Sequence, residues 1–196
     1  MQCDSSKKID IVGKNNRYQM KKVTNSNNTL TKRAESAKWT FSPEYYTPEK
    51  QLIVLNMLHT NDLSAIENNE HSEVVRIMAQ QINKKIMGYK QQDMLKKRYV
   101  EADFLTFRDV VSRLIDSQLK CYYCRGEMCV LYDVMRETLQ WSVDRIDNDK
   151  GHVLNNYHLS CLDCNLKKRR KADETFRFTK QLQLVRENYV EEKSDL

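Results

Sequence analysis

Four cysteines stand in two matching pairs, Cys121 and Cys124 in CYYC and Cys161 and Cys164 in CLDC. Structural zinc takes four thiolate or imidazole ligands at the corners of a tetrahedron, and one C-x-x-C turn supplies two thiolates. These two turns, here called the first and second knuckle, therefore predict one closed zinc site. Two separate redox pairs are the alternative, but no thioredoxin-like βαβ pattern surrounds either pair.

The N-terminus gives no reason to expect disulfides instead. It contains no apolar segment of the kind that a signal peptide needs, so we expect reduced thiols in the cytoplasm or nucleus. No apolar run approaches membrane-spanning length, and we expect no membrane partner. The oligomeric state is left open by the sequence.

The residues between the knuckles predict a small ββα unit. WSVDR alternates and is rich in strand formers, so a strand should end near Asp144. IDNDKGHVLNN has the composition of a turn, and YHLS reads as a short return strand. CNLKKRRKADE consists of helix formers. This order sets a carboxylate at a strand end opposite Asn165 at a helix start.

The segment DRIDNDKGH…NNYHLSCLDCN resembles the HNH (His-Me finger) endonucleases, in the form held by two C-x-x-C knuckles. Similar modules are common in phages and large DNA viruses, so a viral or phage origin fits. The resemblance covers residues 118–172. It implies that Asp144 and Asn165 bind a catalytic Mg²⁺ or Mn²⁺ ion, while the side chain of Asn156 holds the loop in shape.

One position departs from the family pattern. The family usually has its general base, a histidine, directly after the motif aspartate, and here that residue is Arg145. A guanidinium stays protonated and cannot accept the proton, although it suits a phosphate clamp. The base would then be His158, which on a strand faces the same side as Asn156, or His152 in the loop, with Asp147 as a third choice.

A basic run follows the second knuckle directly. Its position beside the expected metal ion favours contact with the DNA backbone, with RNA not excluded. A nuclear localisation signal and a solvated basic face are the alternatives. The run consists of Lys167, Lys168, Arg169, Arg170 and Lys171.

The remaining chain must position this unit, and we expect an α+β fold that is mostly helical. Residues 1–40 hold nine Lys and Arg against three Asp and Glu, which predicts a basic, largely disordered arm. Residues 41–117 should be helical, with one helix starting at Pro48 and another ending at Gly88. A C-terminal helix and tail, 173–196, should pack back through Phe176 and Phe178.

Two functions follow from these patterns. The first is a metal-dependent endonuclease that hydrolyses phosphodiester bonds in DNA. The alternative is a nucleic-acid-binding zinc module that has the same fold and impaired chemistry, which Arg145 would explain.

Overall fold

Helices and one small antiparallel sheet form the described part of the chain. The computed structural model describes residues 32–34, 36, 39, 41–60 and 71–182, so most of the expected basic arm and residues 183–196 lie outside it. Its elements are η2 (Pro43–Tyr46), α2 (Pro48–Thr60), α4 (Ser72–Leu95), η3 (Glu101–Asp103), α5 (Phe107–Asp116), β1 (Trp141–Arg145), β2 (Tyr157–Cys161), α6 (Leu162–Lys168) and α7 (Asp173–Gln181). The expected α+β class is confirmed.

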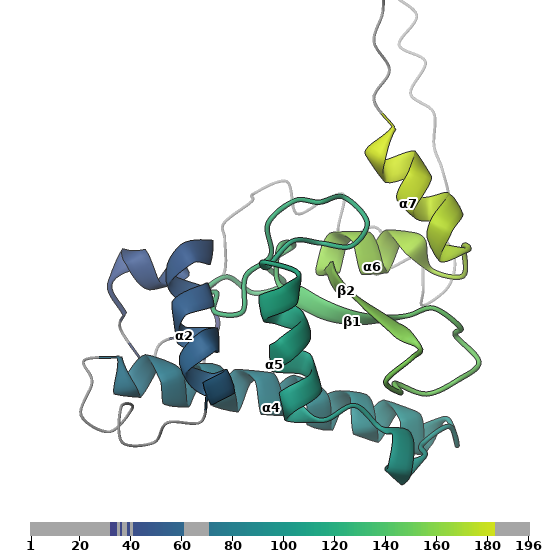
Figure 1. Cartoon of the computed structure of the whole chain (residues 1–196), viewed down its shortest axis with the longest axis horizontal. Helices are drawn as coiled ribbons and strands as arrows, with labels where there is room; N and C mark the ends of the chain where they lie inside the picture. The colour runs from purple at the N-terminus through teal and green to yellow at the C-terminus, as the bar shows by residue number, and fades with distance from the viewer. Residues whose placement is uncertain (1–31, 35, 37–38, 40, 61–70, 183–196) are drawn as a thin grey trace, which may run out of the picture.

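Local signals explain where α2 and α5 begin. The backbone N–H of Lys50 donates to Thr47 Oγ1 at 3.4 Å, directly before Pro48 opens α2. At α5, Thr106 and Asp109 form a reciprocal capping box. Both helices lie across the long helix α4, which runs beneath them in Figure 1. They pack on it through an apolar stripe of α4 that consists of Val74, Val75, Met78, Ile82 and Ile86.

The expected end of this helix at Gly88 is wrong, because α4 continues to Leu95. A single glycine within a helix costs only about 1 kcal/mol relative to alanine. The turns beyond it make long-range contacts: Val143 N–H donates to Tyr89 Oη at 3.0 Å, and Asp93 is fully buried against the loop that follows β1. These tertiary contacts stabilise the two extra turns.

The expected strand–loop–strand–helix order is present. β1 and β2 pair antiparallel, with Trp141 opposite Cys161 and Asp144 opposite His158. Helix α6 follows β2 without a break and packs on both strands. It begins at Leu162, so Asn165 is its fourth residue and not its first.

The basic run does not continue this helix. α6 ends at Lys168, and Arg169 adopts φ 54°, a left-handed conformation that no helix interior tolerates. Helix α7 then starts at Asp173, with Phe176 buried. Phe178 is 66% exposed, so the expected packing of Phe178 is wrong. The two phenylalanines lie two residues apart, which points them to different sides of a helix.

One hydrophobic core joins the helices to the ββα unit, from Val54 in α2 to Phe176 in α7. Because this core spans both parts, the domain boundary expected between residues 117 and 118 stays a prediction. Within the residues described, no helix has the length and apolar character needed to cross a membrane.

Candidate metal centre and catalytic face

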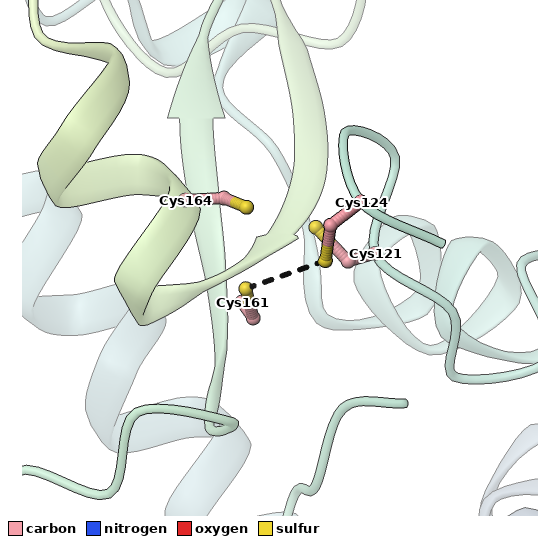
Figure 2. A group of neighbouring side chains, drawn as sticks. All are labelled: Cys121, Cys124, Cys161 and Cys164. Atoms are coloured by element: carbon pink, nitrogen blue, oxygen red, sulfur yellow. Dashed lines mark hydrogen bonds between the residues drawn. The ribbon is translucent and has the colours of Figure 1, made fainter. Parts of the chain in front are cut away.

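The four knuckle cysteines meet at one point although two of them lie some forty residues from the others. Cys121 and Cys124 lie on the turn after α5, Cys161 ends β2, and Cys164 lies in the first turn of α6. Figure 2 shows their sulfur atoms turned toward a common centre. All four sulfurs lie within 4.8 Å of one another, and the Sγ atoms of Cys124 and Cys161 are 4.0 Å apart.

This arrangement fits a zinc ion. A tetrahedron with Zn–S bonds of ~2.3 Å requires sulfur atoms about 3.8 Å apart. The cysteines of the described ranges are free thiols, and Cys121, Cys161 and Cys164 are buried. A hydrogen bond from the Cys161 thiol lowers the pKa of Cys121, whereas the same hydrogen bond raises the pKa of Cys161 and burial raises the pKa of Cys164. The cluster is therefore a candidate metal centre of the structural, closed type.

A second cluster lies on the face of the hairpin that α6 covers. Side chains alternate along a strand, so Asp144 and its cross-strand partner His158 share this face with Ser142 and Ser160. From α6, Asn165 Nδ2 donates to Ser142 Oγ at 3.1 Å and to the Val143 carbonyl at 3.2 Å. The expected ion ligands Asp144 and Asn165 are thus brought to one face, here called the catalytic face.

Asp144 lies in a tight polar setting. It is 4% exposed, and its Oδ2 accepts hydrogen bonds from Tyr123 Oη and from Lys168 Nζ, the latter at 2.9 Å. Burial raises the pKa of Asp144, although both donors favour the carboxylate. No donor within the described ranges contacts Oδ1. The carboxylate oxygen of Asp144 and the amide oxygen of Asn165 are of the kind that Mg²⁺ and Mn²⁺ bind. Oδ1 is the oxygen of Asp144 that remains for such an ion.

His158 is held in one orientation beside Asp144. Its ring stacks on Tyr122, with centroids 3.6 Å apart and planes inclined by 7°. Its Nε2 is 3.1 Å from Asp173 Oδ2 at the start of α7. Burial lowers the pKa of His158, and the Asp173 carboxylate offsets part of this change. The bond to Asp173 leaves Nδ1 of the ring available as a proton acceptor.

His152 has a different setting. It is 3% exposed, its Nδ1 lies 2.8 Å from Asp93 Oδ1, and its backbone N–H donates to Asp93 Oδ2. Its ring also stacks on Tyr89. The structure therefore brings His152 to α4 and not to the catalytic face, which does not favour the expected role as a base.

Arg145 and Asn156 both hold the loop between the strands. Asn156 Oδ1 accepts from Asp147 N–H at 2.8 Å, and its Nδ2 donates to the carbonyls of Asp147 and Gly151. Arg145 Nη1 donates to the Lys150 carbonyl at 3.1 Å. By strand alternation Arg145 points away from Asp144. Gly151 is required here, because a Cβ would lie 2.5 Å from the Arg98 carbonyl oxygen.

The basic run is divided by the structure. Lys168 is completely buried, and its Nζ also donates to the Arg145 carbonyl at 2.6 Å. The expectation that Lys168 contacts nucleic acid therefore fails for this conformation, because its ammonium group neutralises Asp144. Lys167 is exposed and pairs with Asp163 at 2.8 Å. Arg169, Arg170 and Lys171 are exposed in the turn before α7.

Sequence reasoning missed the residues that position the two histidines and Asp144. Tyr122 and Tyr123 lie inside CYYC, where only their place between metal ligands could have drawn notice. Asp93 and Asp173 lie 59 and 15 residues from their histidine partners. No local spacing predicts such pairs.

Comparison with known proteins gives no match for this chain among protein-family models, curated proteins or solved structures.

Proposed function

We propose that this chain is a metal-dependent endonuclease that hydrolyses phosphodiester bonds in DNA at the catalytic face. The observation that carries the proposal is the pairing of Asp144 with His158 across the hairpin, below Asn165 of α6. A carboxylate and an amide oxygen beside an oriented imidazole can hold a cation and accept a proton at one phosphate. A zinc ion in the cysteine cluster would support this use, because it would tie the end of β2 and the start of α6 to the first knuckle.

In this proposal His158 is the general base. Asp173 holds the Nε2 side of the ring, so Nδ1 takes the proton from the attacking water. Tyr122 prevents the ring from rotating. Asp144 and Asn165 would hold a divalent ion, which would stabilise negative charge on the scissile phosphate and the leaving oxygen.

One observation favours the alternative, a zinc module that binds nucleic acid without cutting it. The ammonium group of Lys168 already lies 2.9 Å from Asp144 Oδ2, where it supplies the positive charge that a metal ion would bring. If Lys168 remains there when DNA is bound, a divalent ion reaches only one oxygen of Asp144. The two functions therefore differ in whether an ion can bind beside Lys168.

A plasmid-cleavage assay with Mg²⁺ or Mn²⁺ tests the proposal. Asp144→Asn keeps the shape of the side chain and should abolish cleavage, because a neutral amide holds the ion poorly. This substitution leaves the buried ammonium group of Lys168 without its carboxylate partner, which destabilises the fold. The zinc content of the variant therefore serves as the check that it still folds. Binding of DNA without divalent ions should persist.

The two histidines provide the matched comparison in the same assay. His158→Ala should lower the cleavage rate about 10²–10⁴-fold, the usual contribution of a general base. His152→Ala should leave the rate of the folded fraction within a few-fold of wild type. A wild-type protein that binds DNA but never cuts it would establish the alternative function.

A further inference from the structure

An open groove of about 330 Å³ lies beside His158, between the end of α5 and the first knuckle. This size is near the lower limit for ligand sites and suits a short stretch of an extended chain. His158 and Tyr122 line it together with four charged side chains. Those charged residues are Arg113, Asp116, Lys120 and Arg125.

Lys120 and Arg125 are the two cations of this groove that are available to a ligand. Both are exposed, and neither side chain forms an ion pair or hydrogen bond with any residue that the structure describes. Arg113 differs, because its guanidinium donates to the carbonyls of Tyr157 at 2.7 Å and Leu154 at 2.8 Å. Asp116 is the single acidic residue of the lining, so the groove carries net positive charge.

The basic run at residues 167–171 offers less to an anion. Lys167 is paired and Lys168 is buried. Arg170 and Lys171 line another open pocket, of about 430 Å³, together with Asp147 and Asp149. Two carboxylates there oppose the two cations, whereas the groove beside His158 has three cations against one carboxylate.

The first knuckle fixes the cations of the groove in place. Arg125 has φ 60°, and its backbone N–H donates to the Cys121 carbonyl at 2.9 Å, which closes the turn around the metal ligands. Lys120 directly precedes Cys121, and its backbone N–H donates to the Ser117 carbonyl. A zinc ion on the knuckle would therefore order the backbone of both residues before any ligand binds, which lowers the entropy that binding must overcome.

We infer that this groove binds the phosphate backbone of the nucleic-acid strand that is presented to His158, and that Lys120 and Arg125 contact its phosphates. The inference rests on the proposed function for the direction of the strand toward His158. Phosphate contacts of this kind fix the position of a strand and carry no sequence information. The groove therefore gives binding without sequence preference. It supplies phosphate contacts that the buried Lys168 cannot make.

Binding of a fluorescent DNA duplex without divalent ions tests the inference on the full chain loaded with zinc. The test variant is Lys120→Gln with Arg125→Asn, since asparagine tolerates positive φ. We expect affinity to fall at least tenfold near 0.1 M salt. The slope of log Kd against log salt should become shallower by about 0.9 for each phosphate that the variant no longer neutralises. The control is Arg76→Gln, which removes an exposed cation near the start of α4, outside the groove. This variant should bind like wild type.

Separate readings distinguish the failure of the groove from the failure of the nuclease. Equal affinity and salt slope in wild type and the double variant overturn the groove, whatever the cleavage assay shows. Weakened binding in a protein that never cuts supports the groove and removes the nuclease. Lys120→Arg with Arg125→Lys should retain binding, which excludes misfolding as the cause. Equal binding of polyglutamate, with the same dependence on both residues, would overturn the assignment to nucleic acid.

Discussion

Two histidines that lie close together in the sequence each pair with an aspartate, and the two pairs differ in their surroundings. His152 pairs with Asp93 at 2.8 Å, and His158 pairs with Asp173 at 3.1 Å. Each histidine also stacks on a tyrosine. The side chains of the first pair are 4% and 1% exposed, whereas both side chains of the second are 20% exposed. The same pair of chemical groups therefore occurs in two environments that differ in burial.

The buried pair acts as a clamp. Asp93 accepts from both the ring and the backbone of His152, and its own carbonyl accepts from Arg98 N–H at 2.8 Å. These bonds fix the end of α4 to the loop between β1 and β2. In the half-buried pair, His158 instead lies opposite Asp144 across the hairpin and lines an open groove. Burial makes the first pair structural, and partial exposure makes the second a candidate for chemistry.

Removal of zinc should break both pairs at once and has the largest expected effect. Both histidines lie between the knuckles, and a structural zinc site contributes an apparent ~10–16 kcal/mol, comparable with the whole stability of a domain at ~5–15 kcal/mol. Cys161→Ser should therefore lose the metal and unfold residues 118–172, as measured by elemental analysis and near-ultraviolet circular dichroism. Cys129→Ser, outside the cluster, should keep one zinc per chain. A fully folded wild-type chain without zinc would contradict this prediction.

Replacing the aspartates one at a time should separate the two pairs. Asp93→Ala leaves two buried donors of His152 without a partner and should lower the free energy of unfolding by about 3–5 kcal/mol. Asp173→Ala should change it by less than about 1 kcal/mol, because that pair is partly solvated. Its effect should appear in cleavage, with a loss of about 10²-fold from a misplaced base.

Urea unfolding and initial cleavage rates measure these two outcomes on the same preparations. Asp173→Asn is the conservative control, since an amide can still hold the ring and should recover part of the rate. If Asp93→Ala and Asp173→Ala were equally destabilising, burial would not be what distinguishes the pairs.

The smallest effect concerns pH. Burial lowers the pKa of both His152 and His158 in the folded protein, below the value of about 6.5 that the unfolded chain retains. As the pH falls through 6.5, the unfolded chain therefore binds protons that the folded chain does not. The stability that the neutral histidines contribute is present in full above about pH 7 and decreases toward the lower folded pKa.

Urea unfolding at pH 7.5, 6.5 and 5.5 measures this dependence. The difference between wild type and His152→Gln should shrink as the pH falls, and His158→Gln should show the same trend to a smaller extent because His158 is less buried. A difference that grows with acidity would mean that the protonated histidine is favoured in the fold.

The sequence alone was sufficient for features that depend on neighbouring residues. The helix start at Pro48 and the strand–loop–strand–helix order both follow from local propensity and spacing. The convergence of the four cysteines also followed, because C-x-x-C turns and a ββα order leave few ways to satisfy a tetrahedral ion. The loop contacts of Asn156 agree with what the resemblance implies.

Only the tertiary structure decided which polar groups are buried and with whom they pair. Lys167 and Lys168 are adjacent and chemically identical. Lys168 is buried and pairs with Asp144, whereas Lys167 is exposed and pairs with Asp163. His152 likewise depends on a distant partner, which lies in α4. Helix α4 itself continues past Gly88 because Tyr89 and Asp93 contact the hairpin. Burial of a polar side chain requires a partner brought from elsewhere in the chain. Local sequence therefore determined the kinds of residues at the site, and long-range packing decided which of them remain open to a ligand.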